Sequence, residues 1–191
     1  MKKKMIFGEA IALANSRAND MFATEEEKRI YKKPQKVTMK LRYVGQSFGI
    51  DSLTNGRIYD VIGKCGDMLR VIDDSGEDYL YFSDHPAPLD GSSPGGKWEM
   101  VAGETILYAF DMIEEFICGK YDPIAFSYDL PDYLAESFDK MVAENAVVAE
   151  ILNEEIPEIC AEYERGMDPT NFINKIKEQY DMVHGICCNH I

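Results

Sequence analysis

The sequence predicts an α+β fold in which a small five-stranded β-barrel precedes an antiparallel four- or five-helix bundle. Residues 37–101 alternate apolar and polar side chains in five short runs, which is the period of a β-strand. Residues 104–184 instead repeat apolar side chains every three or four positions, which is the period of an amphipathic helix. Five short strands with turn-rich loops fit a small closed or nearly closed barrel, and helices with short connections fit a bundle.

The two periods also give the domain organisation. Ahead of the strands, Ile6, Ala10 and Leu13 share one helical face, and Pro34 interrupts the charged stretch KKPQK. We therefore expect four segments: an N-terminal helix and linker over 1–36, the barrel over 37–102, an acidic helical bundle over 103–184, and a frayed tail over 185–191.

The acidic stretch DDSGED, residues 73–78, separates the third and fourth predicted strands. Gly76 permits the positive φ of a tight turn, and Asp73 and Asp74 favour a turn by bonding backbone amides. A calcium loop of the EF-hand type requires a glutamate at its twelfth position, where Asp84 stands here. The stretch therefore predicts a hairpin turn that binds no calcium and carries no catalytic carboxylate pair.

The string LTNGRIYDVIGKCGDMLRVIDDSGEDYLYF, which covers these strands, resembles the small SH3-like barrel modules of short bacterial and phage proteins. The resemblance covers part of the predicted barrel. It implies an SH3-like barrel that serves as an accessory or interaction module, and it implies no activity.

Apolar stripes predict the helices of the second half. The first stripe includes Phe110, Ile113 and Phe116 and ends at Gly119, a natural helix stop. The later segments are a short one that starts at Asp122-Pro123, one over 130–144, one over 146–164 in which Pro157 is expected to kink or break the helix, and one over 171–183. Cys118 and Cys160 fall on apolar stripes and are expected in the core.

The residues that could carry chemistry give no site. The tail offers four potential metal ligands, but adjacent cysteines do not readily share one tetrahedral ion with both flanking histidines. These four residues are His184, Cys187, Cys188 and His190. The sequence contains no phosphate-binding glycine loop, no zinc-protease motif and no nucleophile elbow. We therefore predict a protein that is not an enzyme and that has no metal and no cofactor.

The charge is concentrated in the second half of the chain. Residues 104–191 hold 19 Asp and Glu against 5 Lys and Arg, whereas the net charge of the whole chain is −14. This surface would repel phosphate, which argues against direct nucleic-acid binding and favours a basic protein partner. No apolar run reaches the length of a membrane span, Glu9 interrupts the only signal-like start, and five scattered cysteines form no disulfide framework, so we expect a cytoplasmic protein.

One stretch of the predicted bundle is strongly acidic. Residues 111–140 contain eight acids and only two lysines, although exposed helix faces usually mix both signs. We expect these acids to form a toxin-binding face: Asp111, Glu114, Glu115, Asp122, Asp129, Asp132, Glu136 and Asp139. A solvated polar face without a partner is the alternative interpretation.

The segments EEFICGKYDPIAFSYDLPDYLAE and NAVVAEILNEEIPEICAEYE are similar to the small acidic helical immunity proteins of the colicin-D immunity type. Such proteins neutralise a nuclease toxin by presenting acidic side chains to its basic substrate cleft. The resemblance implies an immunity protein for a bacterial contact-dependent or polymorphic nuclease toxin. The alternative hypothesis is a phage or mobile-element regulatory adaptor whose barrel binds a protein or peptide.

Overall fold

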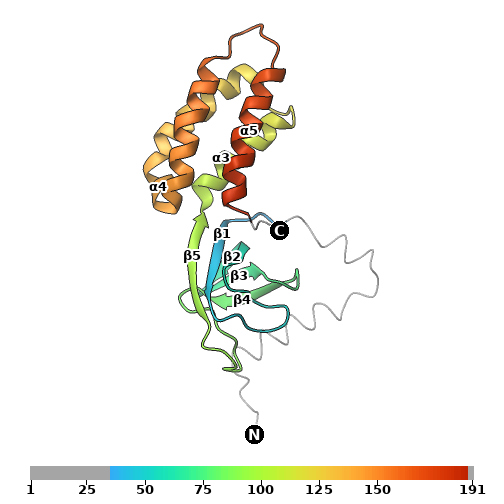
Figure 1. Ribbon diagram of the computed structural model, residues 1–191, viewed down its shortest axis with the longest axis vertical. Helices are drawn as coiled ribbons and strands as arrows, with labels where there is room; N and C mark the ends of the chain where they lie inside the picture. The colour runs from blue at the N-terminus through green and yellow to red at the C-terminus, as the bar shows by residue number, and fades with distance from the viewer. Residues whose placement is uncertain (1–34, 189–191) are drawn as a thin grey trace, which may run out of the picture. The chain divides into compact units, whose positions relative to one another are not determined.

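The computed structural model describes residues 35–188 (Figure 1). From Val37 onward the chain forms one compact unit, in which five strands precede three helices. The helix predicted within 1–36 lies outside the described residues. The switch from strands to helices occurs between Ala102 and Glu104, where the hydrophobic period of the sequence changes.

The strands form one antiparallel sheet in the order β4-β3-β2-β1-β5. Their bounds are β1 Met39–Gly45, β2 Ile58–Cys65, β3 Met68–Ile72, β4 Asp78–Phe82 and β5 Gly96–Ala102. Apolar residues alternate into the core of the sheet, as at Leu69 and Val71 on β3, which are 5% and 0% exposed. The hairpin between β3 and β4 confirms the predicted turn, since Gly76 has a φ of 77°.

The prediction of a closed SH3-like barrel is wrong, because the sheet is open. Its edge strands β4 and β5 share no backbone ladder, and β5 pairs with β1 instead. A side chain links the two edges: Trp98 Nε1 on β5 donates to the carbonyl oxygen of Phe82 on β4 over 3.0 Å. The Trp98 ring also lies 6.3 Å from the Tyr81 ring on β4. A bulky indole therefore occupies the seam where backbone pairing would close a barrel.

The prediction of a four- or five-helix bundle is also wrong, because three helices follow the sheet. They are α3 Glu104–Ile117, α4 Pro123–Ala161 and α5 Thr170–Ile186. Three of the predicted segments fall within α4, and its helical backbone continues through both Pro131 and Pro157. The expected break at Pro157 therefore does not occur.

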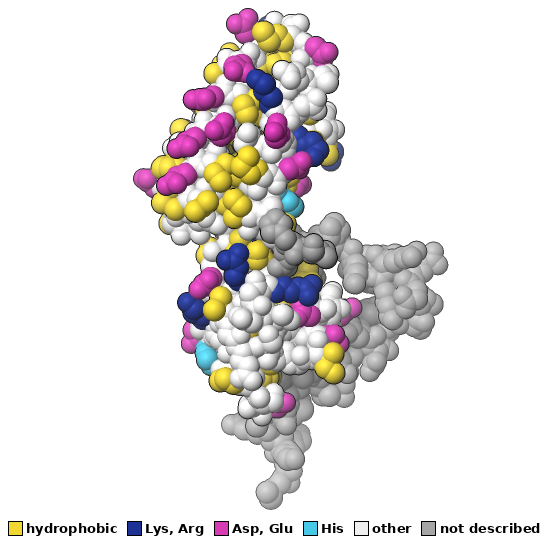
Figure 2. Space-filling model, viewed as in Figure 1, with side chains coloured by type: hydrophobic (Ala, Val, Ile, Leu, Met, Phe, Trp, Pro, Cys, Tyr) yellow, Lys and Arg dark blue, Asp and Glu magenta, His cyan; other side chains and the backbone are white. Residues whose placement is uncertain are grey.

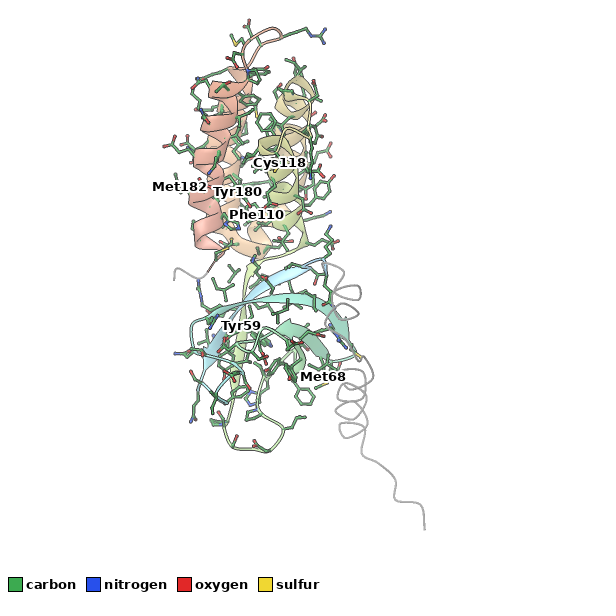
Figure 3. All side chains as sticks on the ribbon, turned by 90° about the vertical axis from the view of Figure 1, so that its right-hand side faces the viewer. Tyr59, Met68, Phe110, Cys118, Tyr180 and Met182 are labelled. Atoms are coloured by element: carbon green, nitrogen blue, oxygen red, sulfur yellow. The ribbon has the colours of Figure 1, made fainter. Side chains whose placement is uncertain are left out.

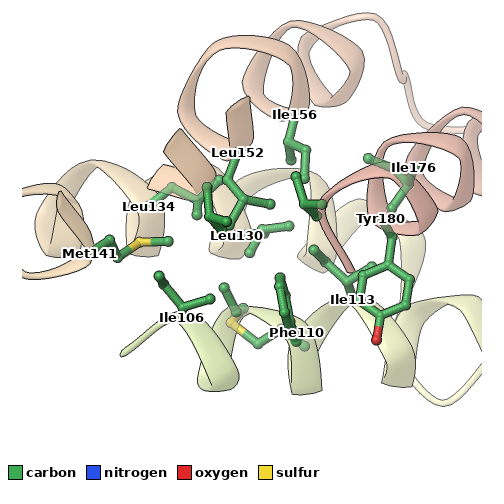
Figure 4. Packing of buried hydrophobic residues seen from close by; sticks show 14 of the residues in the cluster. Ile106, Phe110, Ile113, Leu130, Leu134, Met141, Leu152, Ile156, Ile176 and Tyr180 are labelled. Atoms are coloured by element: carbon green, nitrogen blue, oxygen red, sulfur yellow. The ribbon is translucent and has the colours of Figure 1, made fainter. Parts of the chain in front are cut away.

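Asn145 is the residue of α4 with non-helical backbone angles, φ −158° and ψ 103°. The chain changes direction there (Figure 1), so α4 has a first arm over 123–144 and a second arm over 146–161. Both arms contribute to one apolar core with α3 and α5 (Figure 4). The fully buried members of this core include Ile106, Ile113, Leu130, Leu134, Met141, Leu152, Ile156 and Ile176.

Of the two cysteines that were expected in this core, one is buried and the other is exposed. Cys160 on the second arm is 2% exposed, and burial raises the pKa of its thiol to about 12. Cys118 is exposed, because it follows the last residue of α3 as the C-cap instead of lying on the apolar stripe.

A single residue, Gly103, joins the sheet to the helices, and α4 caps this joint from the side. The Glu144 carboxylate accepts hydrogen bonds from the backbone N–H groups of Gly103, Thr105 and Ile106 over 3.0, 2.9 and 2.9 Å. The first N–H groups of a helix lack partners within the helix, so this carboxylate supplies the cap that the sequence around Gly103 does not. A Cβ at Gly103 would lie 2.3 Å from Glu144 Cδ, so a larger residue would displace the carboxylate from its capping position.

The neighbouring side chains extend the same joint. Asn145 Nδ2 donates to the Val101 carbonyl oxygen over 2.9 Å, and Asn145 Oδ1 accepts from the Val148 N–H over 3.3 Å. Cys187 is fully buried after the end of α5, with its sulfur 3.8 Å from the same Val101 oxygen. Residues 185–187 are thus helical or packed where a frayed tail was predicted, because the thiol reaches the end of β5.

Candidate protein-binding surface

The eight acids predicted as a binding face lie on α3, on the start of α4 and along its first arm. All eight side chains are exposed. They do not all remain available, because the fold uses at least three of them. Asp122 caps α4 by accepting from the Ala125 N–H over 2.9 Å, Asp129 accepts from the Tyr121 hydroxyl over 2.8 Å, and Glu114 accepts from the Tyr180 hydroxyl.

The contact of Glu114 fixes α5 against α3. The ring of Tyr180 on α5 lies 5.5 Å from that of Phe110 on α3, edge to face (Figure 3). Burial and then the Glu114 carboxylate raise the pKa of the Tyr180 hydroxyl. The hydroxyl therefore stays protonated and donates a hydrogen bond to Glu114. Glu114 thus contributes to packing between helices, a role that the sequence pattern did not indicate.

Three of the predicted acids, Asp132, Glu136 and Asp139, form a row along the first arm of α4. Their spacing of four and three residues places them on one side of the helix. Within the described part of the chain their carboxylates make no hydrogen bond or ion pair. We call these three residues the acidic row. Its carboxylates face water and are available to a partner.

Tyrosines lie on α3, before the start of α4 and on its first arm. The rings of Tyr108 on α3 and Tyr133 on α4 are 4.9 Å apart, and Tyr133 donates to the Thr105 carbonyl oxygen over 2.9 Å. Tyr108 is 50% exposed and Tyr128 is 68% exposed. Asp129 raises the pKa of the neighbouring Tyr121 hydroxyl to about 12, mainly because it accepts a hydrogen bond from that hydroxyl. Exposed tyrosines beside carboxylates offer a partner both apolar area and hydrogen bonds.

A second acidic surface lies between the second arm of α4 and α5, where the structure has a shallow groove of about 290 Å³. Figure 2 shows Asp and Glu side chains gathered over the helices on this side of the molecule. The groove is lined by Glu155, Glu158, Ile159, Glu162, Lys175, Glu178 and Gln179. Two consecutive helices supply these residues, so the groove depends on how α5 packs against α4 and not on spacing within one helix. Lys175 pairs with Glu162 over 2.6 Å and partly neutralises it.

The carboxylates of the β3–β4 hairpin form bonds to neighbouring strands and loops. Asp73 is only 8% exposed and accepts from the Tyr81 hydroxyl and from Ser75 Oγ, both over 2.6 Å. Asp74 accepts from the Tyr59 hydroxyl over 2.9 Å, and Arg57 pairs with it over 3.0 Å. These acids hold the hairpin to the preceding loop. The prediction that this hairpin binds no calcium stays a prediction.

The potential metal ligands of the tail have different surroundings. Cys188 lies 3.4 Å from His184 Nε2 on the last turn of α5, whereas burial raises the pKa of Cys187 to about 11. His190 lies outside the described residues. Over residues 35–188, no group of three or more His, Cys, Asp or Glu side chains is placed to hold a metal ion.

No protein-family model, curated protein or solved structure matches this chain. The resemblance to immunity proteins therefore stays a prediction. None of the three described helices combines the length and the apolar character that crossing a bilayer requires.

Proposed function

We propose that this protein is an immunity protein that binds and neutralises a basic nuclease toxin through the acidic surface of its helices. The acidic row carries the proposal, because Asp132, Glu136 and Asp139 are exposed on one side of a helix and bond to no described residue. Acids with structural roles, such as Asp122 and Glu114, would be retained without a partner. Those of the row have no such role.

The chemistry of a nuclease explains why such a surface inhibits it. A nuclease binds a polyanion, so the cleft that receives its substrate is rich in Lys and Arg. A protein surface that presents carboxylates occupies the same cleft and excludes the nucleic acid. Tyr108 and Tyr128 beside the carboxylates suit arginine in particular, since a guanidinium pairs with carboxylates and stacks on aromatic rings.

The net charge of −14 supports rapid association with a basic partner. Long-range attraction raises the association rate, and salt screens it over about 10 Å at 0.1 M. Inhibition of this kind needs no catalytic residue, metal or cofactor in the inhibitor. We place the protein in the bacterial cytoplasm, where it protects the cell from an incoming toxin.

The test is a calorimetric titration of the chain with the nuclease domain of a candidate toxin, at about 50 and 200 mM salt. The triple variant Asp132→Lys, Glu136→Lys and Asp139→Lys should weaken binding at least about 100-fold, because close charge pairs at interfaces are worth roughly 1.5–7 kcal/mol each. The wild-type affinity should fall at the higher salt concentration. Nuclease assays should show inhibition by the wild-type chain and little by the variant.

The matched control reverses three exposed acids on the second arm, Glu150→Lys, Glu154→Lys and Glu158→Lys. It changes the net charge equally but leaves the acidic row intact. Its affinity should stay within about threefold of the wild type at the higher salt, where long-range effects are screened. Equal binding by the wild type and the row variant would refute the proposed surface.

A further inference from the structure

The sequence around Asn145 contains no residue that forces a helix to end. Residues 140–150 read KMVAENAVVAE and include neither glycine nor proline. Alanine and glutamate are strong helix formers, and asparagine is tolerated inside helices at a modest cost. Tertiary contacts therefore hold the break in α4, chiefly the bonds of the Asn145 side chain to Val101 and Val148.

The hydrophobic register of α4 continues across the break without a shift. The apolar positions on either side of Asn145 follow each other at alternating intervals of four and three residues, and Asn145 occupies one position of the series. The series is Leu134, Phe138, Met141, Asn145, Val148 and Leu152. If Asn145 adopted helical angles, α4 would be one continuous helix of 39 residues, about 58 Å long, with a single apolar stripe.

Such a continuous helix cannot exist in an isolated chain without loss of the core. Leu152 and Ile156 on the second arm and Ile176 on α5 are fully buried against α3 and the first arm (Figure 4). Straightening α4 would carry the second arm and α5 away and expose all of these side chains. The surface complementary to these side chains lies on α3 and the first arm, and a second copy of this chain presents the same surface.

We propose that the chain forms a domain-swapped dimer in which α4 is continuous through Asn145. The second arm and α5 of each copy pack on α3 and the first arm of the other, so the core contacts between these two halves of the monomer form again between copies. Exposed apolar residues flank the hinge: Val142 is 37% exposed and Val147 is 57% exposed. These residues meet their counterparts where the two straightened helices cross, which adds apolar burial that the monomer lacks.

Substitutions at the hinge separate the two states. Proline at position 146 is compatible with the monomer, because it stands at the first residue of the second arm and follows the extended Asn145. In a continuous helix the same proline clashes with the carbonyl group four residues earlier. Ala146→Pro should therefore abolish the dimer and leave the melting temperature of the monomer nearly unchanged. Asn145→Ala should raise the dimer fraction severalfold, because it removes the two bonds that hold the break.

The experiment is size-exclusion chromatography with light scattering on the full chain, refolded from denaturant at high and at low protein concentration. The wild type should give a dimer at high concentration that persists for hours after dilution, because exchange of arms requires unfolding. Ala146→Ser, which both states accommodate, is the matched control and should behave as the wild type. A chain that stays monomeric after concentrated refolding would overturn the proposal. So would a dimer that forms equally in Ala146→Pro or that dissociates at once on dilution.

Discussion

The acidic side chains of the sheet form bonds within the fold, whereas those of the acidic row face solvent. In the sheet, Asp73 and Asp74 accept hydrogen bonds from tyrosine hydroxyls and fix the hairpin to its neighbours. In the helices, Asp132, Glu136 and Asp139 face water without a described partner. Residues 73–78 hold four acids and residues 132–139 hold three, so an acidic sequence alone does not reveal the role of its side chains. The difference lies in which donors the fold brings close.

Glu144 is an exception to this comparison and should give the largest effect, because it is an acid of α4 whose carboxylate bonds within the fold. Glu144→Ala removes the acceptor of three backbone N–H groups at the start of α3. We expect the free energy of unfolding to fall by about 2–4 kcal/mol, because bonds to a charged group are worth roughly 1.5–3 kcal/mol each and water replaces part of the loss. Denaturant titration measures this change. Glu150→Ala on the exposed surface should change stability by less than about 0.5 kcal/mol, and an equal effect of both would contradict the capping role.

Asp73 tests the sheet side of the comparison, with a smaller expected effect. Asp73→Ala leaves the buried Tyr81 hydroxyl without its acceptor, so the free energy of unfolding should fall by about 1–3 kcal/mol. Glu77→Ala, which alters an exposed acid of the same hairpin, is the matched control. Thermal melts of both variants measure the difference. Equal melting temperatures would mean that the hairpin acids are surface charges like those of the acidic row.

Two tyrosines sharpen the comparison with the smallest effect on stability. The pKa of Tyr59 in the sheet is raised to about 12, first by burial, and that of Tyr121 on the helical side is raised to about 12, first by the bond to Asp129. Asp129→Asn should therefore lower the pKa of Tyr121 toward its ordinary value of about 10. Asp74→Asn should leave most of the Tyr59 shift in place, because burial remains.

These pKa shifts also set a pH dependence. The unfolded chain loses the Tyr59 proton near pH 10 and the folded chain near pH 12. The stability that Tyr59 contributes is thus complete below about pH 10 and is lost as the pH rises to about 12. Titration by NMR of isotope-labelled tyrosine, compared with Tyr59→Phe and Tyr121→Phe, assigns the two groups. A Tyr121 pKa that ignores Asp129→Asn would contradict the stated cause.

The sequence allowed good prediction of local structure. Strict alternation in MKLRY and the stripe through Phe110, Ile113 and Phe116 depend on neighbours along the chain, so strands and helices follow from them directly. Whether the sheet closes into a barrel depends instead on the contact between Trp98 and Phe82, which are sixteen residues apart and separated by an irregular loop. The number of helices depended on Pro131 and Pro157, which helical packing accommodates although local propensity opposes it.

The exposure of the candidate face was also predictable, because its acids lie opposite the apolar stripe. The hydrogen-bond partner of each acid was not predictable. Whether Glu114 meets Tyr180, 66 residues later, is decided by the packing of α5 on α3. Glu144 likewise meets Gly103 only because the chain changes direction at the next residue. Contacts of this range leave no periodic signal.

Trp98 is the single tryptophan of the chain, and its position makes it an optical probe of one part of the molecule. Its indole ring lies at the seam of the sheet, with the rings of Tyr43 and Tyr59 at 5.8 and 6.2 Å. Opening of the edges changes the surroundings of this fluorophore, whereas melting of the helices far from it changes mainly the circular dichroism of the peptide groups. Fluorescence and dichroism recorded together would therefore reveal whether the sheet and the helices unfold as one cooperative unit or in two steps.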